Sequence, residues 1–466
     1  MRVRRHMVGG GCGLPTGASR PWRSAGLLAL LLGAVAGRAG ANPVDAFGMG
    51  SRGIALGGAH TALAHDVSAN YYNPAGVVAR KDLSIEIGYL YAAPTLRLNG
   101  RDLEVDVTRG LTAGVVAPGA IGPFRFAFGV ALFLPDERVS RVRAMPREQP
   151  QFMYYDNRPQ RVYLATNLAV QIVPGLYIGG GATFMSRTKG SLELGGQISF
   201  PDPEAESDLR LDLDVDLKAL RYPQAGILWE PVSWLSVGLT YRHRFVLELK
   251  QEFRIAGNVV GQDGGGTILR DGFFGLTSYS TNLFQPRQVA LGLGARPGAR
   301  WLLAFDLVWA QWSEFINPGS RLQMDFDLGP FTDLVDMGSQ PNPPSPRYTD
   351  TFNPRFGVEW IPWKVPKAAL ALRLGYAFEP SPAPPQRSRS MNLVDNHKHH
   401  LSAGLGIALT RLIGALDRPF ELDLHFAYLH MQRRAHRKLD PADPVGDYVS
   451  DGFLLSMGIT MRLRFQ

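Results

Sequence analysis

The strongest constraint on the fold is an alternation of apolar and polar residues that returns in segment after segment of the chain. In residues 450–465 every second side chain from Phe453 to Phe465 is large and apolar, while residues such as Thr460 and Arg462 stand between them. A period of two is that of a β-strand, whose neighbouring side chains face opposite sides of the sheet. Segments of this length can cross a bilayer at a tilt of about 45°. The chain is therefore predicted to be all-β.

Fourteen such segments can be delimited by turn residues, and an even number is typical of a single-chain bacterial barrel. They span residues 82–98, 103–117, 123–134, 161–173, 175–190, 208–230, 234–256, 286–297, 300–312, 351–362, 368–379, 398–411, 419–432 and 450–465. Short turns at 118–122, 174–175, 230–233, 297–299, 362–367 and 412–418 alternate with longer loops at 135–160, 191–207, 257–285, 313–350, 380–397 and 433–449, and only the loop near Asn99 is short. An outer-membrane barrel has this asymmetry, with its turns on the periplasmic side. A soluble β-sandwich could bury the same apolar faces, but it has no reason to segregate its loops.

The first 41 residues are predicted to be a secretory signal. Basic residues precede an apolar run, Ala25 to Ala36, that is too short to span a bilayer, and Ala39 to Ala41 form a small-residue cleavage site. Cleavage after Ala41 would remove six basic residues, no acidic residue and the only cysteine, Cys12, so the net charge would fall from +8 to +2. The charge balance thus gives no support for nucleic-acid binding. No later apolar run is long enough for a transmembrane helix.

Residues 42–80 do not follow the alternation. They contain the small-residue run Gly50 to Ala59 and the run Asp66 to Gly76, which ends in Asn-Pro-Ala-Gly. So much Gly and Ala leaves too little periodic bulk for a strand or an amphipathic helix. Small residues allow a backbone to pack closely against other walls, and Asn-Pro fixes an extended residue followed by a bend. We therefore predict a compact plug over residues 42–80, inside a barrel formed by residues 81–466.

This plug and the strands after it resemble the FadL family, the long-chain fatty-acid and hydrocarbon transporters of the Gram-negative outer membrane. Besides the Asn-Pro-Ala-Gly run, the resemblance rests on Pro286 to Gly294, Trp309 to Ser313, Thr349 to Phe352 with Arg355 and Gly357, and Leu372 to Tyr376. The order and spacing of these segments together make the resemblance specific. Together with the strand count, it predicts a monomeric, 14-stranded antiparallel transmembrane β-barrel with an N-terminal plug inside the lumen.

The resemblance also assigns gating residues. In FadL-type transporters a kink in the third strand opens a lateral gap in the wall, and the Asn-Pro-Ala part of the plug lies near it. Carried over to this chain, the plug residues are Asn73, Pro74, Ala75 and Gly76, and the candidate kink is Gly129. Glycine inside a strand often marks a kink or a bulge. Plain packing is the alternative for Gly129.

Two groups of apolar residues are predicted to bind ligand, one in the third strand and one in the predicted outer loop 257–285. They are Phe126, Phe128 and Phe133, and Phe273, Phe274, Leu276 and Phe284. Exposed apolar residues on a loop usually mark a binding surface. The family resemblance implies that such loops first capture the lipid. The alternative is a loop folded inward as its own small core.

A fatty-acid carboxylate inside a barrel needs a cationic or hydrogen-bonding partner. Four arginines are predicted to face the lumen: Arg242, Arg244, Arg355 and Arg373. Of these, Arg244 and Arg355 are predicted to bind the ligand. The alternative is that the arginines pair with lumen carboxylates, such as Asp306, Glu359, Glu421 or Asp423.

No catalytic constellation stands out, and the chain has no Gly-x-Ser-x-Gly elbow and no Walker-type loop. No metal or cofactor is predicted: the carboxylates of Asp212 to Asp216 are expected on a solvated face and His397 to His400 at a loop end, with metal binding as the alternative for both. The predicted function is passive uptake of long-chain fatty acids or other hydrophobic compounds, by capture on extracellular loops and lateral release through the wall into outer-membrane lipid. The alternative is a structural or assembly barrel that serves a secretion or surface-attachment partner. An outer-membrane enzyme is the third alternative, without an identifiable Ser-His constellation.

Overall fold

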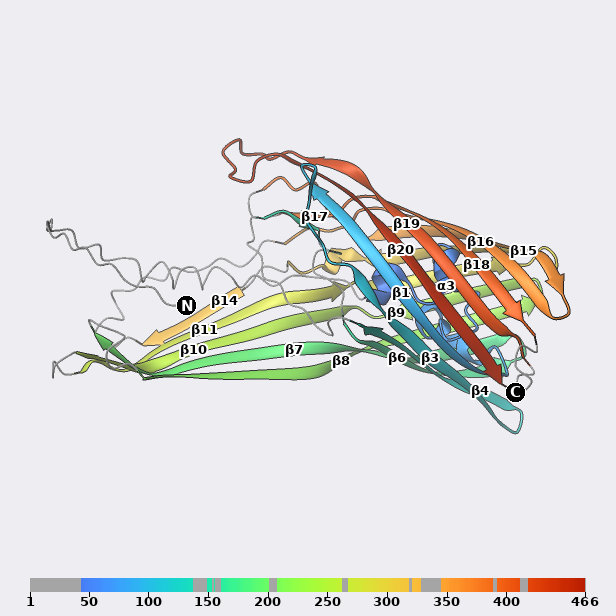
Figure 1. The fold of residues 1–466 in the computed structure, drawn as a ribbon, viewed down its shortest axis with the longest axis horizontal. Helices are drawn as coiled ribbons and strands as arrows, with labels where there is room; N and C mark the ends of the chain where they lie inside the picture. Colours follow the sequence, from blue (N-terminus) through green and yellow to red (C-terminus); the bar gives the residue numbers. More distant parts are fainter. Residues whose placement is uncertain are drawn as a thin grey trace, which may run out of the picture.

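The computed structural model describes residues 43–136, 149–152, 155, 161–200, 208–261, 267–317, 321–327, 345–388, 392–410 and 418–465. The predicted signal, residues 1–41, lies outside them. Within this part the chain forms a closed antiparallel β-barrel of 14 strands, with short helices inside it (Figure 1). The fold class predicted from the alternation is confirmed, strand number included.

Eleven passages through the wall are single strands. They are β1 (Leu83–Leu98), β3 (Thr108–Ile121), β4 (Phe124–Pro135), β6 (Tyr163–Val173), β7 (Leu176–Phe200), β8 (Asp208–Val232), β15 (Thr351–Val365), β16 (Ala368–Glu379), β18 (Lys398–Leu409), β19 (Phe420–His436) and β20 (Tyr448–Phe465). Three passages consist of two segments: β9 (Leu235–Arg242) with β10 (Phe245–Gly261), β11 (Thr267–Gln285) with β12 (Arg287–Ala295), and β13 (Trp301–Gln311) with β14 (Arg321–Asp327). Tight turns between strands use the positive φ that glycine tolerates, as at Gly122 and Gly175.

The first and last strands close the barrel. β1 pairs with β20 in one unbroken register, from Leu83 opposite Phe465 to Leu98 opposite Ser450. The third strand of the wall, β4, pairs without a register shift with β3 on one side and with β6 on the other, through Gly129. The kink expected at Gly129 is therefore not present as a bulge, and the wall is hydrogen-bonded on both sides of it.

Residues 257–285 differ from the sequence-based prediction. They were expected to form an outer loop, but β10 and β11 form a long antiparallel hairpin whose register runs from Phe245 opposite Gln285 to Val260 opposite Thr267. β14 pairs with β11 as well. Glycines in this stretch suggested a loop, yet cross-strand backbone bonding outweighs such local preferences. Figure 1 shows this hairpin and the β7–β8 hairpin extending well beyond the barrel.

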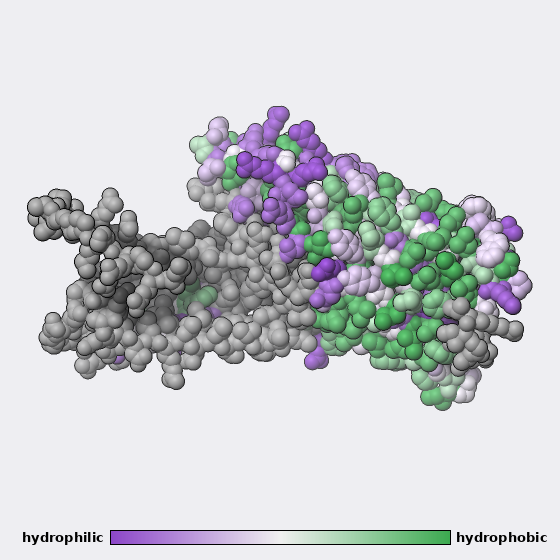
Figure 2. All heavy atoms as spheres, in the orientation of Figure 1, coloured by the Kyte–Doolittle hydropathy of each residue, from purple (hydrophilic) through white to green (hydrophobic). Residues whose placement is uncertain are grey.

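The outer face of the barrel is apolar. In β1, Ile85 and Ile87 are 44% and 46% exposed, whereas Ser84 and Glu86, which face the lumen, are 5% exposed each. Figure 2 shows apolar residues spread over the barrel surface and hydrophilic residues gathered toward the extracellular end of β19 and β20. Several exposed tryptophans lie near the turn ends of their strands: Trp229, Trp234, Trp301, Trp360 and Trp363. This distribution is that of a barrel in lipid with an aromatic belt.

Residues 43–80, called the plug below, lie inside the barrel. Their helical segments are α2 (Pro43–Phe47), α3 (Ser51–Ala55), α4 (Ala69–Tyr72) and the 3-10 helix η1 (Pro74–Val78). The Asn-Pro-Ala run begins η1, because the Asn73 side-chain oxygen accepts a hydrogen bond of 3.1 Å from the Ala75 N–H, and Pro74 takes the first helical position. Among the described residues no helix is long and apolar enough to cross a bilayer.

Candidate functional site

A ring of inward-facing glycines, called the glycine girdle below, surrounds the plug. It consists of Gly114, Gly129, Gly179, Gly226, Gly238, Gly292, Gly357, Gly375 and Gly404, from β3, β4, β7, β8, β9, β12, β15, β16 and β18. A Cβ atom at any of these positions would lie less than 3.0 Å from a plug atom, and at Gly375 only 2.0 Å from the backbone nitrogen of Gly57. The missing side chains let the plug backbone approach the wall directly. The plug therefore fills the lumen at this level.

Amide groups hold the plug on the side formed by β4, β6, β7 and β8, called the amide side below. Asn167 in β6 and Gln224 in β8 donate to the backbone oxygen of Asn70, at 3.2 and 2.7 Å. The Asn73 side chain donates to the carbonyl of Ile227 in β8 at 3.0 Å. The 3-10 helix η1 also packs against these strands. On this side the plug is fixed by hydrogen bonds to its backbone and by close backbone contact, and no carboxylate takes part in these hydrogen bonds; Arg125 of β4 adds a bond of 3.2 Å to the Val78 carbonyl.

Charged groups hold the plug on the side formed by β15, β16, β19, β20 and β1, called the ionic side below. Arg52 in α3 donates two hydrogen bonds of 3.0 Å to Glu359 in β15. Arg373 in β16 donates to Glu359 and to Asp423 in β19, at 2.6 Å each. These side chains are mostly buried, and each charge has an opposite partner, as burial requires.

A second group of charges on the ionic side holds Asp66 of the plug. The Arg462 guanidinium lies 2.5 Å from the carboxylates of Asp66, Glu86 and Glu421. Burial favours the neutral acid, but Arg462 outweighs it and lowers the pKa of Asp66 below its ordinary value. Burial also lowers the pKa of His60 to about 3, so this plug imidazole is neutral near pH 7. Asp66 is thus charged beside a cationic partner, whereas His60 is neutral.

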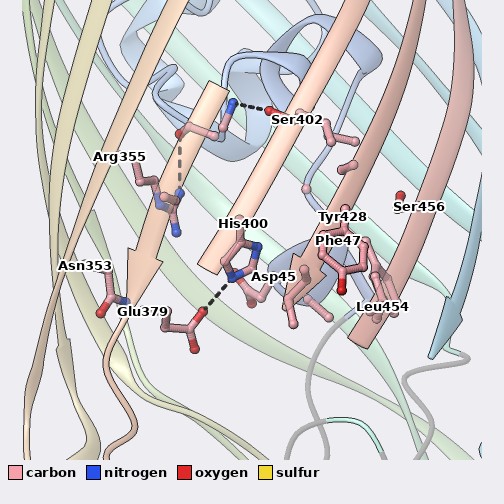
Figure 3. Close-up of a pocket in the computed structure, with 18 of the residues that line it drawn as sticks. Asp45, Phe47, Asn353, Arg355, Glu379, His400, Ser402, Tyr428, Leu454 and Ser456 are labelled. Atoms are coloured by element: carbon pink, nitrogen blue, oxygen red, sulfur yellow. Dashed lines mark hydrogen bonds and ion pairs between the residues drawn. The ribbon is translucent and has the colours of Figure 1, made fainter. Parts of the chain in front are cut away.

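A pocket of about 100 Å³, called the outer pocket below, lies between the plug and the wall on the extracellular side of the girdle (Figure 3). Much of its lining is apolar or aromatic: Phe47, Ile54, Tyr71, Tyr72, Phe378, Tyr428, Leu429 and Leu454. Polar groups reach it from β15, β16 and β18: Asn353, Arg355, Glu379, His400 and Ser402. The lining is thus both apolar and polar, and its charged groups are Arg355 and the carboxylates of Asp45 and Glu379. A cavity in which several polar groups converge can hold a small molecule.

Arg355 differs from four arginines around the plug that have carboxylate partners, Arg52, Arg242, Arg373 and Arg462. Within the described residues Arg355 makes no ion pair, and its guanidinium donates a hydrogen bond of 3.3 Å to the backbone oxygen of Gly58 (Figure 3). On the same face of β15, the Asn353 side-chain oxygen is buried without a hydrogen-bond partner. The outer pocket therefore contains a cation and a polar group with unused bonding capacity.

Apolar clusters fill the extracellular mouth of the barrel. One consists of Phe284, Ala310, Trp312, Phe315, Tyr348, Ala383 and Leu393. The short strands β5 (Gln151–Phe152) and β17 (Leu393–Val394) pair with each other, and Phe152 and Val394 belong to the same core as Leu429 and Leu454 of the pocket lining. An apolar molecule would meet apolar side chains before it reached the outer pocket.

The third-strand residues predicted to bind ligand are divided between two faces. Phe133 faces the interior and is 1% exposed, whereas Phe128 is 46% exposed on the outer face, which Phe126 shares by strand alternation. Gly129 belongs to the girdle, where a Cβ atom would lie 2.3 Å from the side-chain oxygen of Asn70. The structure thus favours close packing, the alternative interpretation, for Gly129.

The residues predicted to capture ligand in 257–285 are largely buried. Leu276 and Phe284 are 3% and 2% exposed, and Phe273 is half-buried. The side chain of Phe274 lies outside the described part of the structure. Phe284 packs inward among aromatic neighbours, which agrees with the alternative interpretation of this segment as an inward-folded core. The described side chains therefore do not form an open capture surface.

The remaining predicted residues occupy different parts of the molecule. Arg244 is exposed and paired with Glu314, away from the outer pocket. Asn73, Pro74 and Ala75 face β7 and β8, because Cβ atoms at Gly179 and Gly226 would collide with them. Gly76 packs within the plug, since a Cβ atom there would lie 1.8 Å from the backbone oxygen of Ala64.

Sequence reasoning missed the glycine girdle and most of the outer pocket. Glycines at lumen-facing positions of many strands were a usable signal, because an interior filled only by water does not require the smallest residue. Asn353 and His400 carried no such signal, since nothing in their local sequence places them beside the plug.

Comparison with known proteins agrees with this architecture. A family model described as "Outer membrane protein transport protein (OMPP1/FadL/TodX)" matches residues 30–462. Alkane uptake protein A of Marinobacter nauticus is 24% identical over 424 residues, which are 86% of each chain. The crystal structure of a Pseudomonas aeruginosa FadL homologue is similar with a TM-score of 0.55 and 15% identity, over 89% of this chain and 97% of that one. For the toluene transporter TodX of P. putida the TM-score is 0.50 at 14% identity, over 90% and 99% of the two chains.

Proposed function

Because the chain belongs to the outer membrane transport family that includes FadL and TodX, we propose that it takes up hydrophobic molecules with one acidic end, such as long-chain fatty acids. The family and the 14-stranded barrel place it in the outer membrane of a Gram-negative cell. What the family leaves open is the chemistry of the cargo. The outer pocket supports a specific answer.

The observation that carries the proposal is Arg355 in the outer pocket. The guanidinium of Arg355 is half-buried and makes no ion pair among the described residues, so a ligand anion could pair with it. A carboxylate can accept two parallel hydrogen bonds from it, which gives direction as well as affinity. The pocket of about 100 Å³ has the volume of roughly three water molecules. It fits a head group, and the acyl chain would extend toward the apolar mouth.

Burial of the chain would supply the driving force. Each methylene removed from water contributes about 0.8 kcal/mol. The apolar clusters at the mouth would receive the molecule first, and the outer pocket would then orient its acidic end. No energy-coupling motif is visible in the sequence, so diffusion down a gradient suffices. The alkane and toluene transporters among the relatives are named for cargo without such an end. Because Arg355 makes no ion pair within the part of the chain that the structure describes, its guanidinium favours an acid over a hydrocarbon.

The test is to compare two probes, oleate and hexadecane, with purified Arg355→Gln. Loss of charge-assisted hydrogen bonds worth about 1.5–3 kcal/mol should weaken oleate binding by roughly 10- to 100-fold. Hexadecane binding should be unchanged. Arg244→Gln is the matched control, because Arg244 is exposed and paired outside the pocket. Equal oleate affinity in Arg355→Gln and the parent would overturn the assignment of the head group.

A further inference from the structure

We propose that the outer face of β18 and β19, at their extracellular ends, binds the phosphorylated head group of an outer-leaflet glycolipid, lipopolysaccharide. This surface, called the head-group face below, consists of His397, His430, Arg433 and Arg437. It belongs to the outside of the barrel, whereas the outer pocket lies inside. The inference therefore goes beyond the proposed uptake and does not depend on the cargo.

The wall below the head-group face is apolar and faces lipid. Leu401 on β18 is 53% exposed, and Phe426 on β19 and Met457 on β20, which stand opposite each other, are 48% and 47% exposed. Side chains of this kind on the outside of a barrel form its apolar band. Four residues beyond Phe426 on β19 the outward position is His430, which stands opposite His399 on β18. The wall thus changes there from apolar to polar.

This change occurs at the height of the lipid head groups. His430 stands opposite Phe453, which lies 12 residues from Phe465 at the periplasmic end of β20. Twelve strand residues span about 40 Å, or about 28 Å across the membrane at a tilt of about 45°. The apolar band of an outer-membrane barrel is about 25 Å tall. His430 is therefore at the level where acyl chains end and head groups begin.

A β-bulge in β19 places a cation at this level. The register shifts between Met431 and Arg434, so Gln432 and Arg433 both stand opposite Asp451. In such a bulge two residues share one partner position and the alternation of faces is interrupted. Gln432 and Arg433 are both exposed, whereas Met431 is buried. The bulge thus presents Arg433 on the outer face.

Nitrogen donors from two strands meet beside the bulge. The His397 Nδ1 accepts a hydrogen bond of 3.0 Å from the Ser381 N–H, so its proton is on Nε2, and the residue is exposed. The Gln432 N–H donates to the His397 carbonyl at 2.9 Å, which places His397 next to the bulge. Among the described residues the exposed side chains of His430 and Arg433 make no hydrogen bond or ion pair.

His399 has a different task from these donors. Its Nδ1 lies 2.9 Å from the Tyr376 hydroxyl and its Nε2 lies 2.7 Å from the Gln432 amide nitrogen. Both ring nitrogens are therefore used within the protein. His399 holds Gln432 and the bulge in place, and the donors that remain for a ligand are on its neighbours.

The charges around Arg433 leave its guanidinium available. The carboxylate opposite it in register, Asp451, lies 3.6 Å from Arg97 of β1. Asp102 stands opposite Arg97 on its other side. Arg437, beyond the end of β19, is a further exposed cation. The guanidinium groups of this region thus exceed the carboxylates among the described residues, and the surface attracts an anion.

The anion available at this height is a lipid phosphate. The outer leaflet of a Gram-negative outer membrane consists mainly of lipopolysaccharide, whose disaccharide carries phosphates just above its acyl chains. Guanidinium and imidazole N–H groups are strong donors to phosphate, and basic residues beside a membrane bind anionic head groups. One such lipid could place its phosphate at Arg433 and His430 and its acyl chains against Leu401 and Phe426. Figure 2 shows hydrophilic residues gathered toward this end of the barrel.

The test compares two probes, lipid A and the same lipid A without its phosphates, bound to the detergent-purified protein and measured by native mass spectrometry. The parent should bind lipid A more tightly than the dephosphorylated form. Because a basic residue near the surface contributes about 1 kcal/mol, Arg433→Gln should weaken lipid A binding roughly 5-fold. The double variant Arg433→Gln with His430→Gln should weaken it further. Binding of dephosphorylated lipid A should be the same in all three proteins.

The matched control is Arg300→Gln, because Arg300 is also exposed but lies in the β12–β13 turn at the periplasmic end. It should bind lipid A like the parent, and resistance of each barrel to unheated SDS checks folding. Equal binding of the two probes by the parent would overturn the inference, as would unchanged lipid A binding in the double variant or an equal loss in Arg300→Gln. Displacement of lipid A by an equal concentration of phosphatidylglycerol would also overturn it, since any anionic lipid would then suffice.

Discussion

The two sides of the plug are built differently. On the amide side, neutral side chains such as Asn73 and Gln224 bond to backbone, and the plug lies against β7 and β8. On the ionic side, guanidinium groups join α3 and Asp66 to the wall, and pockets lie above and below the contact. The comparison therefore distinguishes a side held mainly by close backbone contact from a side held by buried ion pairs beside the outer pocket.

Removal of the central cation of the ionic side should give the largest effect. Arg462→Met leaves Asp66 and Glu86 buried without their shared partner, while Glu421 keeps Arg464. Breaking a buried pair on one side typically costs about 3–5 kcal/mol. We expect a lower urea midpoint of unfolding and faster proteolysis within the plug. Arg464→Met is the control, because Arg464 contacts only Glu421 among these carboxylates, and equal losses in the two variants would contradict the central role of Arg462.

A smaller effect is expected on the amide side. Gly179→Val places a Cβ atom 2.5 Å from the backbone of Pro74, so η1 must shift. Overpacking of this kind costs about 1–3 kcal/mol. The expected result is a modest fall in the urea midpoint with ion pairs intact. Gly298→Val in the β12–β13 turn, where a Cβ atom meets nothing within 4 Å, should have no such effect. A Gly179→Val protein as stable as the parent would mean that the amide side is not closely packed.

The barrel could be predicted from the sequence because, along each strand, apolar residues that face lipid alternate with small or polar residues that face the lumen. Residues such as Ile85 and Ile87 face lipid and Ser84 and Glu86 face the lumen, so burial alternates residue by residue. The alternation of short turns and long loops also indicates which end of the barrel faces the periplasm. By contrast, β11 was mistaken for a loop, because its pairing with β10 and β14 depends on partners distant in the sequence.

The candidate site was only partly predictable for the same reason. Arg355 was chosen as one of several inward arginines, and only the fold shows that Arg242 and Arg373 have carboxylates while Arg355 has none among the described residues. Gly129 was predicted as a candidate kink, whereas in the structure it packs directly against Asn70. Strand pairing in the barrel brings together residues that are distant in the sequence, and local sequence patterns do not predict these contacts.

The central claim is that residues 43–80 close the lumen of the barrel. The direct measurement is single-channel conductance in planar bilayers for the parent and for a protein that lacks residues 43–80, with folding of both checked by circular dichroism. We predict that the parent shows no stable conductance and that the deletion gives a steadily open pore. A folded deletion protein that conducts no more than the parent would contradict the account.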